Sequence, residues 1–262
     1  VTPDDFPGFV PKVCVRDGDE VAAGSALLFD KNHPEVKLVS PVTGRVRAVV
    51  RGERRKILRV EVEAASTTAT APALTKATDG ESARQLLAES GLLAMMRQRP
   101  YDIVPNPNDE VRDIFITALD TAPLAAPSAV FSSLFSKEDL AAGIELLKKI
   151  TTGKIYLCYG QDWTFGDIPG AEMVEVEGPF PSGNVGVQIA NIAPVNKGEI
   201  VWTLDFTTLG RIGRVAKGET PEFRTMVALT GPEVATPALV ETTICAQVTN
   251  ILAGHLNKDE HH

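Results

Sequence analysis

The sequence is poor in the residues that build metal sites and disulfide frameworks. Its three cysteines, Cys14, Cys158 and Cys245, are far apart and lack the short spacing of zinc or iron–sulfur ligands. Two of the four histidines are His261 and His262, which we interpret as the remnant of a purification tag. An odd cysteine number favours reduced thiols, and we interpret Cys245 as a small buried residue on a strand. We therefore expect neither a metal ion nor an iron–sulfur centre in this chain.

Long apolar runs and an excess of positive charge are missing as well. The most apolar long window, residues 234–253, contains Glu241, Gln247 and Asn250, so it predicts no transmembrane helix. The acidic residues 1–5 do not resemble a signal peptide, and the missing initiator Met suggests a trimmed fragment. Lys and Arg number 26 against 34 Asp and Glu, a net charge of −8. This balance argues against nucleic acid as a partner.

What the chain does contain divides into an all-β part and an α/β part. Residues 1–66 hold short β-type runs between Gly and Pro turns, which predicts a small all-β module. After an Ala/Thr/Ser-rich linker, the rest of residues 67–230 alternates apolar strands with helices, which predicts an α/β layer with a mostly parallel sheet. Residues 231–260 have the pattern of one strand and one helix, the start of a further module, and 261–262 are the tag.

Local signals give bounds to several elements of the α/β part. Thr78 and Glu81 have capping-box spacing before a first helix, and Gly91 suits the left-handed residue beyond its end. Ser136 and Asp139 have the same spacing before a second helix, which is expected to end at residues 148–149. Strands are expected at residues 114–119, 155–159, 200–204 and 225–229, and a further helix at residues 209–215.

The first module contains two Gly-bearing half-patterns, VRDGDEVAAGSAL (15–27) and SPVTGRV (40–46). They resemble the barrel-sandwich hybrid fold of biotinyl and lipoyl carriers, with glycines at tight turns and Val and Leu filling a thin sandwich. In such carriers a modified lysine lies between the two halves. Lys31 and Lys37 lie there in this sequence, without either carrier signature, so we interpret the region as a solvated turn and expect no attached group.

The order of motifs along the whole chain is more specific. The runs DKNHPEVK (30–37), RGERR (51–55), RQRP (97–100) and ALDTAPLAA (118–126) resemble the A subunit of the Na⁺-translocating NADH:quinone oxidoreductase family. The resemblance covers essentially the entire chain. It implies a barrel-sandwich hybrid module, a Rossmann-like α/β domain, and a truncated β-grasp ligand-binding segment at residues 231–260.

The same architecture occurs in the flavin subunit of respiratory complex I and in the C subunit of the Rnf pump, but their cofactor motifs are missing here. Those proteins have a Gly-rich loop after Ser-Gly-Leu, which lets backbone N–H groups approach a phosphate. Residues 92–100 contain no glycine, and the Leu and Met side chains of residues 92–96 are expected to close the loop with helical structure. An acidic run of those proteins is reduced to Asp120. We therefore expect no cofactor in this chain, and flavins and iron–sulfur centres in partner subunits.

The resemblance implies a peripheral, cofactor-free subunit of a sodium-pumping NADH:quinone reductase of the respiratory chain. Such a protein would support reduction of ubiquinone or menaquinone coupled to sodium transport, and would have no activity in isolation. Its place would be the cytoplasmic side of the bacterial inner membrane, bound to membrane and peripheral subunits of the same complex. Two other interpretations stay open: a soluble module that binds a small ligand, and an unmodified carrier-like scaffold.

One cluster combines residue types that suit a flat molecule with carbonyl groups. Arginine donates to a carbonyl oxygen, aromatic rings stack, and methionine adapts to irregular shapes. Since the resemblance implies quinone, the candidate quinone-binding residues are Phe6, Phe9, Met96, Arg97, Arg99 and Tyr101. The alternative for Arg97 and Arg99 is an ion-pair role across a seam between domains or subunits. No catalytic, cofactor-binding or metal-binding residue is predicted.

Overall fold

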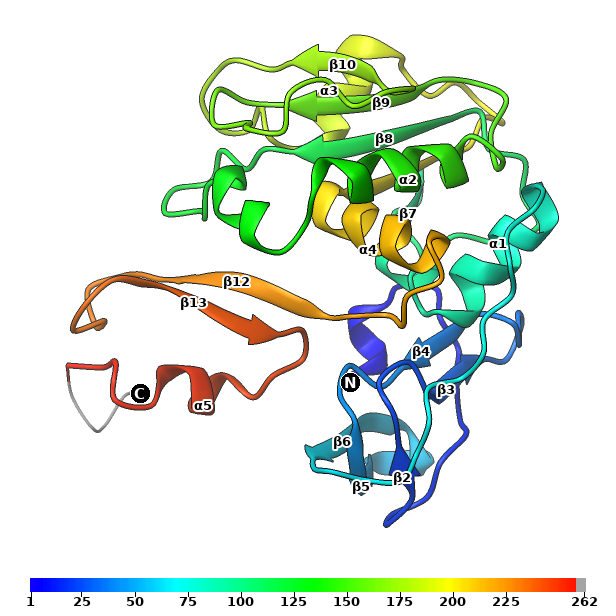
Figure 1. Cartoon of the computed structure of the whole chain (residues 1–262), viewed down its shortest axis with the longest axis vertical. Helices are drawn as coiled ribbons and strands as arrows, with labels where there is room; N and C mark the ends of the chain where they lie inside the picture. The colour runs from blue at the N-terminus through cyan, green and yellow to red at the C-terminus, as the bar shows by residue number, and fades with distance from the viewer. Residues whose placement is uncertain (258–262) are drawn as a thin grey trace.

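The structure is a computed structural model that describes residues 1–257. The predicted tag at residues 261–262, and the last three residues of the predicted segment 231–260, lie outside the described residues. The N-terminal β module lies below an α/β layer, and a two-stranded hairpin with a short helix projects to one side (Figure 1). The boundaries at 66/67 and 230/231 stay predictions.

Two small antiparallel sheets form the N-terminal module, with strand orders β1-β3-β4 and β2-β5-β6 within the described chain. Leu27, Leu28 and Val46 are buried in this module. At Gly44 a Cβ atom would lie 2.0 Å from the carbonyl oxygen of Glu63, so the pairing of β5 with β6 requires glycine there. The strands and 3₁₀ turns are η1 (Pro3–Asp5), β1 (Pro11–Val13), β2 (Glu20–Val21), β3 (Ala26–Asp30), β4 (Lys37–Val39), β5 (Gly44–Arg51), η2 (Glu53–Arg55) and β6 (Ile57–Ala64).

The α/β layer is built on a mixed sheet with the order β10-β9-β8-β11-β7 among the described residues. The first four strands in this order are mutually parallel, and β7 runs antiparallel at the edge beside β11. This sheet confirms the expected mostly parallel α/β architecture. Its strands are β7 (Arg97–Arg99), β8 (Asp113–Ala118), β9 (Ile155–Tyr159), β10 (Glu172–Glu175) and β11 (Val201–Asp205).

Helices cover both faces of this sheet (Figure 1). On one face α2 and α4 pack against each other, and alternate residues of β8, such as Ile114 and Ile116, belong to the main core. On the other face Phe115 stacks on Tyr156, and both pack with Ile189 of α3. The helices and 3₁₀ turns of this part are α1 (Gly80–Glu89), η3 (Leu93–Met95), η4 (Ser128–Ser133), α2 (Lys137–Leu147), α3 (Val185–Ile192) and α4 (Phe206–Ala216).

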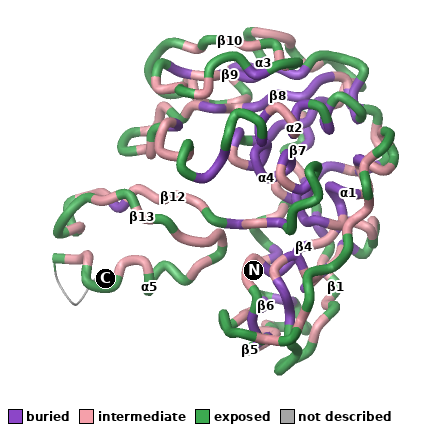
Figure 2. Tube along the Cα trace, in the orientation of Figure 1, coloured by how far each residue is buried: buried purple, intermediate pink, exposed green. Residues whose placement is uncertain are grey.

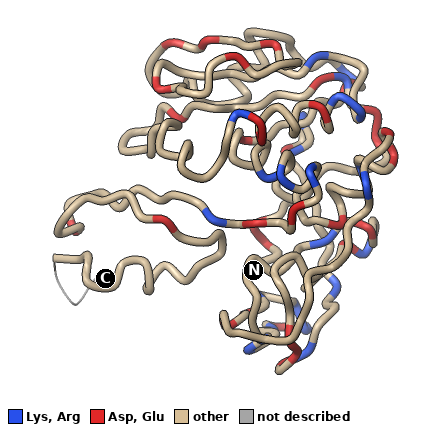
Figure 3. The backbone as a smooth tube through the Cα atoms, in the orientation of Figure 1, with Lys and Arg blue, Asp and Glu red and all other residues tan. Residues whose placement is uncertain are grey.

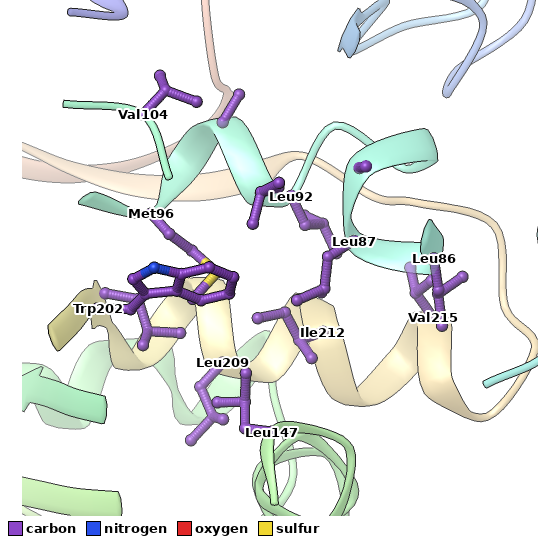
Figure 4. Packing of buried hydrophobic residues seen from close by; sticks show 14 of the residues in the cluster. Leu86, Leu87, Leu92, Met96, Val104, Leu147, Trp202, Leu209, Ile212 and Val215 are labelled. Carbon is purple, nitrogen blue, oxygen red and sulfur yellow. The ribbon is translucent and has the colours of Figure 1, made fainter. Parts of the chain in front are cut away.

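The main core joins α1 and η3 to the sheet and to α4. Figure 4 shows Met96 lying against the Trp202 indole, with Leu209 and Ile212 of α4 nearby. Met96 and Trp202 are both fully buried. Loss of such a buried side chain removes transfer energy and leaves a cavity, so this contact stabilises the position of β7 beside β11.

The last described segment, residues 224–257, is less buried than the rest of the chain. The strands β12 (Arg224–Leu229) and β13 (Ala238–Thr243) pair as an antiparallel hairpin, followed by α5 (Val248–Leu252). Figure 2 shows mostly intermediate and exposed residues along this segment, in contrast to the buried strands of the α/β layer. One strand and one helix were expected at residues 239–256, and the structure confirms both.

Two local predictions are wrong. The first helix is capped by Asp79, whose carboxylate accepts from Ser82 N–H while Ser82 Oγ receives from Asp79 N–H, so Thr78 and Glu81 do not form the cap. Cys245 is exposed in a turn with φ 66°, not buried on a strand. The loop after Gly91 contains the single 3₁₀ turn η3 and then becomes strand β7.

No helix among residues 1–257 combines the length and the apolar character that a membrane span needs.

Candidate functional site

A cavity of about 620 Å³ opens where β8 and β11 end. The chain passes from β8 outward through β9 and β10 and then returns to β11 on the other side of β8, so the strand order changes direction here. Crevices outside the carboxyl ends of parallel strands at such a point are a common place for ligands. The lining residues are Met95, Arg97, Arg99, Asp102, Thr117, Ala118, Leu119, Asp120, Ala126, Ser128, Phe131, Gly183, Asn184, Val185, Thr203, Leu204, Asp205, Phe206, Thr207 and Thr225.

The edge strand β7 brings two arginines to this cavity. Arg97 and Arg99 are two residues apart on a strand, so they share one face, and both line the cavity. Gln98 points the other way, where its Oε1 accepts from Trp202 Nε1 at 3.2 Å and its Nε2 donates to Asp109 at 2.7 Å. Alternation along the strand therefore separates the two arginines from the buried residues beside them.

The two arginines have different partners. The Arg97 guanidinium donates to the backbone carbonyls of Ala94, Met96 and Asp5 at 2.9–3.2 Å, which fastens β7 to the N-terminal segment. Arg99 Nε lies 3.4 Å from Asp102 Oδ1, close enough for an ion pair. Within residues 1–257, however, Arg99 Nε is buried and has no hydrogen-bond partner.

The N-terminus of α4 forms another part of the wall. Asp205 ends β11 and caps α4, since its Oδ1 accepts from Thr208 N–H at 2.7 Å and from Thr207 Oγ1 at 2.5 Å. Arg211, one turn further, donates to Thr207 Oγ1 at 2.7 Å and to the carbonyl of Arg224 at 2.8 Å. Burial lowers the pKa of Arg211 from its ordinary value. These bonds hold the end of α4 in place beside the cavity.

Aromatic rings supply the apolar part of the wall. The rings of Phe131 and Phe206 meet edge to face with centroids 5.5 Å apart. The ring of Trp163, which does not belong to the cavity lining, lies 5.6 Å from that of Phe206. Edges and faces of this kind suit a flat aromatic or quinonoid ring.

The η4 turn and the loop before α3 contribute polar groups on the side of β8. Ser128 is only 4% exposed, and its N–H donates to Asp162, but its Oγ has no hydrogen-bond partner in the described chain. Gly183 N–H donates to Thr121 Oγ1 at 3.0 Å. A Cβ at Gly183 would lie 2.8 Å from the backbone nitrogen of Thr121, so this loop approaches the end of β8 very closely.

The charges that line the cavity nearly cancel. Among the described residues, the charged residues of the lining are Arg97 and Arg99 against Asp102, Asp120 and Asp205. Lys and Arg are likewise interspersed with Asp and Glu along the α/β layer (Figure 3). Such a wall does not attract polyanions over distance, and it suits a neutral ligand with polar oxygens.

The structure brings only part of the predicted quinone cluster to this cavity. Arg97 and Arg99 line it, whereas Phe9 and Met96 are buried in the core. Phe6 lines a separate apolar crevice of about 40 Å³, and Tyr101 is 78% exposed outside the cavity lining. The predicted cluster is therefore distributed over four different environments.

Other lining residues were missed by the sequence analysis. Asp205, Phe206 and Ser128 were not predicted as site residues, and Asp120 was identified only as the remainder of an acidic run. A usable signal was present, because Asp120 and Asp205 each follow or end an apolar strand, and parallel neighbours bring such residues to one edge. Ser128 carries no comparable signal.

No group of three or more potential metal ligands gathers within the described part of the chain. Burial raises the pKa of the Cys158 thiol to about 12, so this thiol is protonated at neutral pH and is not a nucleophile there. Lys31 lies exposed in the turn after β3, and Lys37 begins β4.

Three family models match this chain in sequence. The NqrA N-terminal barrel-sandwich hybrid domain matches residues 1–65, and the NqrA second alpha/beta domain matches residues 78–219. The NQRA C-terminal domain matches residues 226–262. The second of these models alone covers more than half of the chain.

Similar curated proteins are named as the A subunit of the Na(+)-translocating NADH-quinone reductase. The protein of Yersinia pseudotuberculosis is 34% identical over 266 residues, which is 98% of this chain and 59% of the relative. The protein of Klebsiella pneumoniae is 33% identical with the same coverage, and that of Neisseria meningitidis serogroup A is 33% identical over 97% of this chain and 58% of the relative. The chain thus spans just under three fifths of the length of these relatives.

Proposed function

Because this chain belongs to the NqrA family, we propose that it acts as a peripheral subunit of the Na⁺-translocating NADH–quinone reductase. It lies on the cytoplasmic side of the bacterial inner membrane and binds membrane and peripheral subunits of the same complex. Those neighbours hold the flavins and iron–sulfur centres and transfer the electrons. The assembled complex is the oxidoreductase and sodium translocase, and this chain alone does not oxidise NADH.

The role of the α/β layer in this proposal is to bind the headgroup of ubiquinone or menaquinone in the cavity at the ends of β8 and β11. One observation carries it, namely the composition of the cavity wall. A volume of about 620 Å³ is within the ordinary range for small-ligand sites. The edge-to-face rings of Phe131 and Phe206 suit a flat ring, the arginines of β7 suit carbonyl oxygens, and the balanced charges favour a neutral ligand.

The proposal that the chain has no cofactor of its own rests on the loop after Gly91. Leu92, Leu93 and Met96 are fully buried there, so their side chains fill the space beside the sheet. A flavin phosphate needs exposed backbone N–H groups at close range, which glycine permits and these side chains do not. An absorbance spectrum of the purified protein and of its acid supernatant tests this. A stoichiometric flavin band would contradict it.

The cavity proposal is tested by titrating the protein with a soluble short-chain ubiquinone while following tryptophan fluorescence. Trp163 reports on the site because its ring lies 5.6 Å from that of Phe206, which lines the cavity. We expect saturable quenching that is absent with an alkyl chain lacking the quinone ring.

A matched pair of variants locates the binding. Ala126 lines the cavity and Ala125, its neighbour on the same loop, does not belong to the lining. Ala126→Trp should fill the space and abolish binding, whereas Ala125→Trp should leave it intact. Equal binding by both variants would place the quinone elsewhere.

The proposed role within the complex needs a separate test. A complex prepared without this chain should lose quinone reduction while the partner subunits still accept electrons from NADH. Full quinone reduction without it would contradict the proposed role.

A further inference from the structure

Few buried side-chain atoms of residues 1–257 lack a partner, and two of them belong to residues that line the same cavity. In the described chain the buried side-chain atoms that lack a hydrogen bond are Arg99 Nε, Ser128 Oγ and Arg211 Nε. Arg99 and Ser128 both line the cavity at the ends of β8 and β11, on different elements. An unmade hydrogen bond at a buried group costs free energy, so such groups in a ligand-sized cavity point to a ligand that completes them.

We propose that Arg99 and Ser128 are the two polar anchors of the ligand in this cavity, and that Arg97 is not. The inference rests on the proposed function, in which the ligand is a quinone headgroup. In this arrangement the Arg99 side chain turns toward the cavity, its guanidinium donates to one oxygen of the quinone, and Ser128 Oγ bonds to another. The Phe131 and Phe206 rings pack against the ring between them.

The separation of the two arginines follows from their existing bonds. Arg97 already donates to the backbone carbonyls of Ala94, Met96 and Asp5, so a ligand bond from those nitrogens would replace bonds that fasten β7. Arg99 Nε lies 3.4 Å from Asp102 Oδ1, which is within ion-pair distance, but it makes no hydrogen bond in the described chain. A turn of the Arg99 side chain toward the cavity therefore lets the guanidinium donate to a quinone oxygen without breaking an existing hydrogen bond.

Ser128 suits both redox states of the ligand. A hydroxyl is donor and acceptor, so it donates to a quinone carbonyl and accepts from the O–H of the corresponding hydroquinone. Because no hydrogen bond holds Ser128 Oγ, rotation about χ1 turns it toward the ligand at little cost. Its backbone is meanwhile fixed, since Ser128 N–H donates to Asp162.

The charge of the wall decides between a neutral and an anionic ligand. Asp102 lies beside Arg99, and Asp120 and Asp205 also line the cavity, so the carboxylates offset the arginines. A phosphate or a nucleotide would be repelled by these carboxylates, whereas a quinone is not. The anchors therefore serve a neutral ring with two oxygen acceptors.

The test compares three variants in the quinone titration. Ser128→Ala removes the unused hydroxyl, Arg99→Lys keeps the positive charge but removes Nε–H, and Ser133→Ala is the control from the same 3₁₀ turn. Ser133 is exposed, does not belong to the cavity lining, and donates to the Val130 carbonyl at 3.1 Å. We expect Ser128→Ala and Arg99→Lys each to weaken quinone binding roughly five- to thirty-fold. Ser133→Ala should bind like the parent protein.

The melting temperature of Ser128→Ala distinguishes a ligand-binding role of Ser128 from a structural one. Since Ser128 Oγ has no partner in the described protein, its removal should leave the melting temperature unchanged or slightly higher while affinity falls. A lower melting temperature with unchanged affinity would make Ser128 a structural residue and overturn the inference.

The remaining outcomes separate this inference from the proposed function. If the parent protein binds quinone and both variants bind it within two-fold, the anchors are wrong and the quinone cavity stands. If the parent protein shows no saturable binding, the quinone cavity itself fails. Displacement of bound quinone by inorganic phosphate would assign the wall to an anion and overturn the neutral-ligand argument.

Discussion

Replacement of Gly213 by Ala should separate helices α2 and α4 and destabilise the α/β layer. A Cβ at Gly213 would lie 1.7 Å from the carbonyl oxygen of Asp139, whereas ordinary contacts begin near 3.4 Å. The backbones would therefore have to move apart by about the difference, 1.7 Å, because neither atom belongs to a flexible side chain. Overpacking of this kind costs about 1–3 kcal/mol or more, and the helix propensity of Ala returns only about 1 kcal/mol.

The control for this prediction is Gly186→Ala in helix α3. Nothing lies within 4 Å of a Cβ at Gly186, so the substitution meets open space. It should leave stability unchanged or raise it by about 0.5–1 kcal/mol through the unfolded chain. The two variants thus make the same chemical change with opposite expected signs.

Urea unfolding followed by circular dichroism, with thermal melts beside it, measures both variants. We expect Gly213→Ala to unfold at least about 2 kcal/mol more easily, which corresponds to a melting temperature lower by roughly 4–8 °C for a protein of this size. Because α4 begins with Phe206 and Thr207 in the cavity wall, quinone affinity should fall with it. Equal stability of Gly213→Ala and Gly186→Ala would refute the close-packing argument.

Three further predictions concern charge, thiol chemistry and the missing flavin. Burial acts to raise the pKa of Asp139, but bonds from Lys217 and from Ser136 N–H outweigh it and hold the pKa below its ordinary value. The lowered pKa of Asp139 means that its carboxylate stabilises the folded state above the unfolded pKa of about 4, and that this contribution is lost as the pH falls further. Asp139→Asn should therefore flatten the acid limb of a stability–pH curve. A disulfide reagent at pH 8 should label the exposed Cys14 but label Cys158 only after unfolding, which mass spectrometry after digestion can show. Replacing Met95 and Met96 by Gly should not create stoichiometric flavin mononucleotide binding by equilibrium dialysis, and micromolar binding would contradict our account of the loop.

Much of the fold could be predicted from the sequence because its signals are local. The strands around Ile114–Ile116 and Ile155–Tyr159 are short and almost wholly apolar, as strands buried on both faces must be. The capping box of Ser136 and Asp139 formed as expected, and Gly91 has φ 78°. The first helix shows the limit of such signals, because Thr78 and Asp79 both suit a cap and only the bonds to Ser82 decide between them.

The candidate site was much harder to predict from the sequence than the fold, because tertiary structure decides which residues share a surface. Met96, Arg97, Arg99 and Tyr101 are close in sequence and were predicted as one cluster. Strand alternation turns Met96 toward Trp202 and the two arginines toward the cavity, while Tyr101 lies exposed beyond the strand. The residue types thus indicated the chemistry, but the pleat of a three-residue strand decided which of them share a surface.

The sequence by itself determined the family, the order of the elements and the region from which the arginines come. Tertiary structure alone decided that Ser128, in a turn after β8, lies with Arg99 on the wall of one cavity. The physical reason is that a cavity at the ends of parallel strands is assembled from loops that are distant along the chain. No local periodicity or spacing encodes their meeting, and it arises only when β11 pairs with β8 and β7 pairs with β11.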